Sequence, residues 1–163
     1  MPVIRQAARD DAPIILRLIQ ESFETVYLRL GITAENWPRH AANMGPEWVL
    51  GEMDEGNRFF ILEDCGQACG CIAMRQADAD SVLLRRLAVL PAHRGKGCGR
   101  MLVAHVIAEA RRLAARRVTL GMWAPEHELR RWYERQGFVY TETRSYEGLP
   151  LPVVHMALDL GAA

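Results

Sequence analysis

Arg94-Gly95-Lys96-Gly97-Cys98-Gly99-Arg100 is the stretch of sequence from which the fold can be deduced. Its three alternating glycines follow an apolar run, Val82 to Leu90, and precede a segment, Gly97 to Ala115, whose apolar residues recur at helical spacing. Such a turn leaves successive backbone N–H groups open to a ligand. The helix N-terminus and the three cations add positive potential. We therefore predict that this turn binds a pyrophosphate.

Two common phosphate-binding loops do not fit this turn. A Walker loop requires a serine or threonine directly after its lysine, but Gly97 follows Lys96. A dinucleotide fingerprint that began at Gly95 would require a glycine at the position of Arg100. A plain strand–helix connector, the remaining alternative, would not need three glycines and three cations within seven residues. The pyrophosphate therefore belongs to a different kind of ligand.

The letters from Leu84 to Gly99 resemble the acetyl-CoA signature of the GCN5-related N-acetyltransferases, whose core is Arg/Gln-x-x-Gly-x-Gly/Ala. Arg94, Gly97 and Gly99 fill those positions, and Tyr133-Glu134-Arg135-Gln136-Gly137-Phe138 matches the family's later Tyr-x-x-x-Gly-Phe. The resemblance implies an N-acetyltransferase that transfers the acetyl group of acetyl-CoA to a primary amine by direct attack in a ternary complex. It implies no metal.

The resemblance also assigns roles to individual residues. The pyrophosphate of acetyl-CoA would bind to the backbone of Arg94, Gly95, Lys96, Gly97, Cys98, Gly99 and Arg100. The pantetheine arm would pair like a strand with Leu87, Ala88 and Val89, in a gap where that strand splays from its neighbour. Tyr133 would be the catalytic acid that donates a proton to the leaving thiolate. The alternative for Tyr133 is plain packing beside Trp132 and Phe138.

Two family positions are occupied by unusual residues. Relatives often carry an acid where this chain has Leu83, and an asparagine where the alignment places Glu126. An ionised carboxylate donates no hydrogen bond, so a cofactor contact of Glu126 stays open. The residues that could instead deprotonate the amine are Glu21, Glu24, Tyr27 and His155. The sequence does not choose among them. The empty base position also keeps open a non-catalytic acyl-CoA-binding or sensor module of the same fold.

Apolar periodicity and turn residues outline the other elements. A first helix is expected from Asp10 to about Phe23, because Asp10 and Asp11 are acidic capping residues. Further helices are expected at Glu47–Met53, Gly97–Ala115 and Pro125–Gln136. Strands are expected at Val3–Arg5, Arg58–Glu63, Ala68–Arg75, Val82–Leu90, Arg117–Trp123, Val139–Arg144 and Val153–Leu160. This order predicts an α/β (α+β) fold, and the resemblance implies its form: a mixed, mostly antiparallel central sheet of six to seven strands flanked by about four helices, the acyl-CoA N-acyltransferase fold.

Composition places limits on the kind of protein. With half of its 163 residues hydrophobic, the chain can bury one ordinary core, so we expect a single domain over residues 1–163. No apolar run approaches the roughly 18 residues of a membrane-spanning helix, and the first residues lack a signal peptide's apolar core, so we expect a cytoplasmic protein with no membrane partner. A homodimer stays open.

The cysteines do not form a metal-binding pattern. Cys65, Cys69 and Cys71 lack a fourth ligand nearby, and the expected arrangement places Cys69 and Cys71 on one face of a strand as buried thiols.

The charges are unevenly distributed along the chain. The net charge is zero, but residues 1–81 hold 7 basic and 13 acidic side chains and residues 82–163 hold 13 and 7. A net charge of zero disfavours a nucleic-acid partner, although the arginine-rich second half leaves a nucleic-acid binder open as an alternative. The acidic first half favours a cationic amine acceptor, either a small molecule or a peptide.

Overall fold

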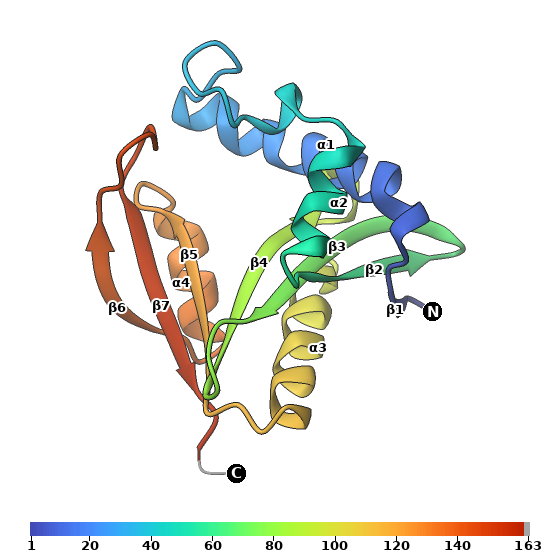
Figure 1. The fold of residues 1–163 in the computed structure, drawn as a ribbon, viewed down its shortest axis with the longest axis vertical. Coiled ribbons are helices and arrows are strands. Elements are labelled where there is room, and N and C mark those ends of the chain that lie inside the picture. The colour runs from blue at the N-terminus through green and yellow to red at the C-terminus, as the bar shows by residue number, and fades with distance from the viewer. Residues whose placement is uncertain (162–163) are drawn as a thin grey trace.

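The computed structural model describes residues 1–161, and its central feature is a seven-stranded sheet in the order β1-β2-β3-β4-β5-β7-β6 (Figure 1). All neighbouring strands are antiparallel except β4 and β5, which are parallel. The strands are β1 (Val3–Gln6), β2 (Arg58–Asp64), β3 (Gln67–Gln76), β4 (Ser81–Val89), β5 (Arg117–Trp123), β6 (Val139–Arg144) and β7 (Val153–Asp159).

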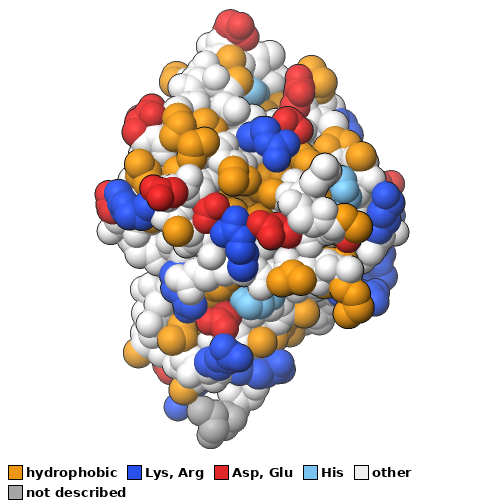
Figure 2. Space-filling view, turned by 90° about the vertical axis from the view of Figure 1, so that its right-hand side faces the viewer, with side chains coloured by type: hydrophobic (Ala, Val, Ile, Leu, Met, Phe, Trp, Pro, Cys, Tyr) orange, Lys and Arg blue, Asp and Glu red, His pale blue; other side chains and the backbone are white. Residues whose placement is uncertain are grey.

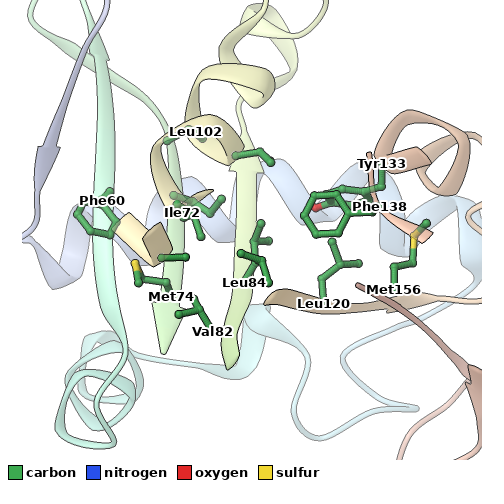
Figure 3. Close-up of a cluster of buried hydrophobic side chains, with 14 of the residues drawn as sticks. Phe60, Ile72, Met74, Val82, Leu84, Leu102, Leu120, Tyr133, Phe138 and Met156 are labelled. Carbon is green, nitrogen blue, oxygen red and sulfur yellow. The ribbon is translucent and has the colours of Figure 1, made fainter. Parts of the chain in front are cut away.

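Helices cover both faces of the sheet, so the molecule has three layers (Figure 1). α1 (Ala12–Leu30) and α2 (Pro46–Asp54) pack on one face, and α3 (Cys98–Arg112) and α4 (His127–Arg135) pack on the other. Figure 3 shows the core under α3 and α4, where Leu102, Tyr133 and Phe138 meet side chains of the strands. The predicted fold class is confirmed.

The sheet opens between β4 and β5. Their parallel pairing covers only Ser81–Leu83 against Arg117–Thr119, after which the two strands diverge like the arms of a V (Figure 1). A bulge in β4 lies at Arg86, which adopts a left-handed φ of 54°. Such bulges bend a strand away from its neighbour. The edge of β4 that faces β5 is therefore free of strand pairing beyond Leu83.

Most predicted elements are found at their expected places, but α1 is longer than expected. It continues past Phe23 to Leu30 and ends where Gly31 takes a left-handed φ of 68°. Its start also differs: Asp11 makes no cap to α1, because its carboxylate accepts hydrogen bonds from the Ala8 N–H and the Arg5 guanidinium instead.

The two buried cysteines of β3 lie on opposite faces of the sheet, contrary to the sequence-based expectation. Cys69 packs in the core under α3, whereas Cys71 packs in the core under α1. The reason is a register shift between Leu62 and Glu63 in the pairing of β2 with β3, which breaks the simple alternation of side chains. Both side chains are buried thiols, as expected, and burial raises the pKa of Cys69 to about 11 and that of Cys71 to about 12.

Figure 2 shows the side of the molecule on which β1 lies, where acidic and basic side chains sit next to one another among apolar ones. On β1, the guanidinium of Arg5 pairs with Asp11 and Glu63 at 2.8 Å each. Among residues 1–161, no helix is both long and apolar enough to span a membrane.

Candidate active site

The gap between β4 and β5 belongs to a cavity of about 990 Å³. Its walls come from both arms of the V, from α1 and α4, and from the turn between β4 and α3. A cavity of this size lies at the upper end of the range of small-molecule and cofactor sites. All of the predicted cofactor-binding and catalytic residues except Lys96 line this cavity.

The glycine-rich turn presents a row of unused hydrogen-bond donors. In the described part of the chain, the backbone N–H groups from Gly95 to Arg100 donate to no other residue. Gly95 and Gly97 make this possible with left-handed φ values of 73° and 84°, which a side chain would disfavour. The row ends in the first turn of α3, where the helix dipole adds positive potential. This arrangement fits a pyrophosphate.

Gly99 has a different role from the other two glycines. A Cβ atom at this position would lie 3.3 Å from Trp132 of α4, a contact tight enough that the tryptophan ring would have to shift. Gly99 therefore lets α3 and α4 approach each other, which places the turn close to Tyr133.

Arg94 holds the turn in place rather than presenting all of its side chain to a ligand. Its guanidinium donates to the carbonyl oxygens of Val89 and Ser22 and to Oγ1 of Thr25, at 3.1, 2.6 and 2.8 Å. The partial burial that accompanies these contacts lowers the pKa of Arg94. Of the two remaining cations, Arg100 lines the cavity and Lys96 is exposed. The turn is thus fixed to α1 through Arg94.

Leu87, Ala88 and Val89 line the cavity along the free edge of β4. Their other edge is paired with β3, where Gly70 lies opposite Val89. A Cβ atom on Gly70 would stand 2.9 Å from the Ala88 carbonyl oxygen, so a glycine is required for the two strands to pair this closely.

Tyr133 lies on α4, where its ring is buried against Trp132 and Phe138 (Figure 3). It also lines the cavity, and its hydroxyl makes no hydrogen bond to any residue in the range 1–161. Burial raises the pKa of this phenol. Both roles considered for Tyr133 are therefore compatible with its position, since it packs in the core and reaches the cavity at once.

The structure separates the four candidate bases. Tyr27 and His155 line the cavity, whereas Glu21 and Glu24 are exposed on α1 and do not. Burial raises the pKa of Tyr27. His155 Nε2 is 2.7 Å from the hydroxyl of Tyr146.

Glu126 stands at the start of α4 and is buried, yet it reaches across to α1. Its Oε1 accepts hydrogen bonds from Nη2 and Nε of Arg29 at 2.5 and 3.2 Å. Arg29 and Glu126 are 97 residues apart, so no sequence pattern pointed to this pair. The carboxylate of Glu126, at the position where the sequence comparison expected an asparagine, is thus paired with Arg29.

The cavity does not have the acidic character that the first half of the sequence led us to expect. Glu126 is the one acidic side chain among its lining residues in the described range. The arginines that line it are Arg29, Arg39, Arg85, Arg86, Arg94 and Arg100. The acidic residues of the first half are mostly on the outer surface, because a count along the sequence does not distinguish the cavity wall from the exterior.

The remaining cysteines add no metal site. Cys98 is buried at the first position of α3 and lines the cavity, and Cys65 is exposed. Within residues 1–161, no three His, Cys, Asp or Glu side chains are grouped so that they would hold a metal ion.

The fold is shared with proteins of known structure. The structure of the ribosomal-protein-S18-alanine N-acetyltransferase from Escherichia coli superposes with a TM-score of 0.78 at 20% identity, covering 100% of this chain and 96% of that one. A GNAT family acetyltransferase from Elizabethkingia anophelis with acetyl-CoA bound gives a TM-score of 0.71 at 14% identity, with 98% of each chain covered.

In sequence, the chain is 26% identical over 144 residues to the uncharacterised N-acetyltransferase YjgM of Escherichia coli K12, covering 86% of this chain and 84% of YjgM. The family model of the acetyltransferase (GNAT) domain matches residues 55–140, more than half of the chain. That range runs from the end of α2 through the glycine-rich turn and Tyr133 into β6. The chain therefore belongs to the GNAT acetyltransferase family.

Proposed function

We propose that this protein transfers the acetyl group of acetyl-CoA to a primary amine by direct attack in a ternary complex. The observation that carries the proposal is the row of N–H groups from Gly95 to Arg100 that donate to no described residue, in the same cavity as Tyr133. Family membership and the acetyl-CoA bound to the Elizabethkingia protein support the choice of ligand.

The residues that would hold acetyl-CoA lie along one path. The turn from Gly95 to Arg100 would bind the pyrophosphate through its N–H groups, with Arg100 adding charge. The free edge of β4 at Leu87, Ala88 and Val89 would pair with the pantetheine arm, since β5 does not occupy that edge. Bound there, acetyl-CoA supplies an activated acetyl thioester.

Tyr133 is the proton donor in this proposal. Because burial raises its pKa, the phenol stays protonated at neutral pH and above. Its hydroxyl is not committed to another described residue, so its proton is available to a thiolate that develops in the cavity. General acid assistance of this kind contributes roughly 10²–10⁴-fold to a rate.

The amine must lose a proton before it can attack, and His155 is the residue we infer to accept it. Tyr27 is unsuited, because its raised pKa keeps it protonated and unable to accept. His155 lines the cavity from β7, and its contact with the Tyr146 hydroxyl fixes the orientation of its ring.

Amine-dependent release of free thiol from acetyl-CoA tests the proposal. The protein is incubated with acetyl-CoA and a broad amine panel, and coenzyme A is quantified by chromatography. We expect release that requires an amine and yields the acetylated amine. Tight binding of acetyl-CoA without any amine-dependent release would instead support a non-catalytic acyl-CoA sensor.

A further inference from the structure

We propose that the amine acceptor carries a carboxylate, which is bound by Arg39 and Arg86 at the end of the cavity formed by α1, α2 and the loop between them. The proposal rests on the acetyltransferase function proposed above and specifies its acceptor. A free amino acid or another small amino-carboxylate has the chemistry that this end of the cavity would recognise.

The first argument is the balance of charge at this end. Arg29 is neutralised by Glu126. Arg85 and Arg86 share a single carboxylate, Glu52, at 3.6 and 2.9 Å. Two guanidinium groups facing one carboxylate leave an excess positive charge.

Arg39 adds a second positive charge. It lies in the loop between α1 and α2, lines the cavity and has no ion pair within the described residues. An exposed guanidinium at the wall of a cavity can form a bidentate pair with a ligand carboxylate. The acceptor end thus carries about two more positive than negative charges, which disfavours a polyamine or another dication.

Arg86 is held in a fixed orientation. Its Nη2 and Nε donate to the two carboxylate oxygens of Glu52 at 2.9 and 3.4 Å, and its guanidinium lies 4.8 Å from the ring centre of Trp48. Its charge also reaches Tyr27 and opposes the effect of burial on the pKa of that residue. Arg86 therefore stands near both Tyr27 and Trp48 in the wall of the cavity.

A separate argument comes from two buried polar groups that have no hydrogen-bond partner. The indole N–H of Trp37 and the hydroxyl of Ser22 are both buried, belong to residues that line the cavity, and meet no acceptor or donor among residues 1–161. An indole N–H can only donate a hydrogen bond, so it matches the oxygen of an anion and not an ammonium group. A buried donor without a partner is costly and points to a ligand group.

The walls around Trp37 are aromatic, which indicates an acceptor with an apolar side chain. Trp37 packs edge-on against Tyr27 and Trp123 at 6.1 and 5.5 Å between ring centres. The same Tyr27 lies 4.1 Å from the ring of His40. We therefore expect amino acids with apolar or aromatic side chains to be preferred over small polar ones.

Matched pairs of acceptors test the proposal. Methionine, leucine, phenylalanine and tryptophan are each compared with their carboxamides and decarboxylated amines, and spermidine and a lysine-containing peptide are added. We expect the free acid to exceed its carboxamide in kcat/KM by about 10- to 100-fold, the value of a charge-assisted hydrogen bond or two. An amino acid amide has the less basic amine, so nucleophile availability alone would favour the amide.

Substitutions of Arg39 locate the carboxylate. Arg39→Gln should raise KM for the acid at least 10-fold while KM for acetyl-CoA changes less than twofold, and Arg39→Lys should restore part of the loss. Arg39→Glu should improve spermidine relative to the acid. Arg17→Gln is the matched control, because Arg17 is also an exposed arginine but pairs with Glu21 and does not line the cavity. Circular dichroism confirms that each variant is folded.

The outcomes separate the two proposals. If no amine of any kind releases thiol although acetyl-CoA binds, the acetyltransferase function itself fails. If carboxamides or polyamines are acetylated as well as the acids, or Arg39→Gln has the same kinetics as the wild type, the function stands and the carboxylate site is refuted.

Discussion

Tyr133 has to meet two requirements that usually conflict. Its ring packs in the core, whereas a catalytic hydroxyl must be accessible to a reactant. In this molecule the ring lies in the core beside Phe138, and the residue nevertheless lines the cavity (Figure 3). Glu52 shows the same combination of burial and chemistry: a single buried carboxylate holds two arginines of β4 in place. Both side chains allow direct experimental tests.

Replacing Tyr133 with phenylalanine removes the hydroxyl and keeps the ring that packs in the core. We expect kcat to fall on the order of 10²-fold or more, because the leaving thiolate loses its proton donor, with little change in acetyl-CoA affinity. Steady-state kinetics and calorimetric titration measure the two quantities. Tyr140→Phe, at an exposed tyrosine of β6, is the control and should behave as the wild type. An unchanged kcat in Tyr133→Phe would remove this residue from the mechanism.

The pH dependence of kcat gives a second test of Tyr133. Its raised pKa means that the phenol remains protonated up to and beyond the ordinary value of about 10. The acid form is therefore present throughout the alkaline range, and kcat should show no decline from tyrosine ionisation below pH 10. A decline centred near pH 8 or 9 that disappears in Tyr133→Phe would contradict this interpretation.

Replacing Glu52 with glutamine should destabilise the fold. Burial alone would raise the pKa of Glu52, but the hydrogen bond and charge of Arg86, together with the charge of Arg85, outweigh burial and hold it below its usual value. The variant leaves two guanidinium groups without their counter-charge, so the free energy of unfolding at pH 7 should fall by about 3 kcal/mol, measured by urea denaturation.

The sign of the pH effect on Glu52 follows from its lowered pKa. A carboxyl group whose pKa is lower in the folded state stabilises the protein above its unfolded-state pKa, and this contribution is lost as pH falls through the folded value. The difference between wild type and Glu52→Gln should therefore shrink on acidification below about pH 4. Glu35→Gln, at an exposed glutamate, is the control. A constant difference from pH 7 to pH 3 would argue against an ionised Glu52.

The strands and helices were largely predictable from the sequence, because apolar periodicity and glycine or proline punctuation depend on neighbours in the chain. β5 and β6 have the predicted bounds, and each of the other strands differs by one residue at one end or at both. α1 was placed too short, since beyond Phe23 its apolar residues form no regular stripe: Val26 and Tyr27 line the cavity, whereas Leu28 is exposed. The opposite faces of Cys69 and Cys71 could not be predicted, because a bulge depends on the partner strand.

The site was predictable to the same extent. The turn from Arg94 to Arg100 is a local motif, so its donors could be anticipated from the letters alone. The Arg29–Glu126 pair and the arginines at the acceptor end could not, because they come from segments far apart in the chain. The charge count of the first half favoured a cationic acceptor, but the charged residues that this half contributes to the cavity lining are Arg29 and Arg39, because its acids lie mostly on the outer surface.

Pairs of glycine substitutions test the close contact between β3 and β4. Gly70→Ala would place a methyl group 2.9 Å from the Ala88 carbonyl oxygen, so we expect a loss of about 2 kcal/mol of stability and a higher KM for acetyl-CoA as β4 shifts. Gly51→Ala in α2 meets nothing within 4 Å and should stabilise the protein by about 0.5–1 kcal/mol. Chemical denaturation and steady-state kinetics measure both effects. Equal stabilities of the two variants would show that β3 and β4 have room to separate.

The whole molecule consists of two arms of sheet that are joined by few strand contacts and bridged by α1. Arg94 links the turn after β4 to the middle of α1, at Ser22 and Thr25, and Arg29 links the C-terminal part of α1 to the start of α4. Arg94, Arg29 and Glu126 all line the cavity. A ligand that contacts both arms should therefore stabilise the molecule as a unit.

Acetyl-CoA should raise the melting temperature by about 5–10 °C at 100 times its Kd, because binding to the folded state alone adds about 2.7 kcal/mol. Acetyl-pantetheine, which lacks the pyrophosphate, should give a much smaller shift at the same concentration, since it cannot use the donors from Gly95 to Arg100. Differential scanning fluorimetry measures both. Equal shifts for the two compounds would show that the turn does not bind the pyrophosphate.

The short pairing of Ser81–Leu83 with Arg117–Thr119 also has a mechanical consequence. A force that pulls β1 away from β6, the two outer strands, passes through every strand pairing of the sheet in series. The pairing of β4 with β5 is the shortest in the sheet and lies beside the cavity, so the sheet would separate there first. A bound ligand that contacts both strands would hold them together. The force needed to rupture a single protein molecule would then report whether the cavity is filled.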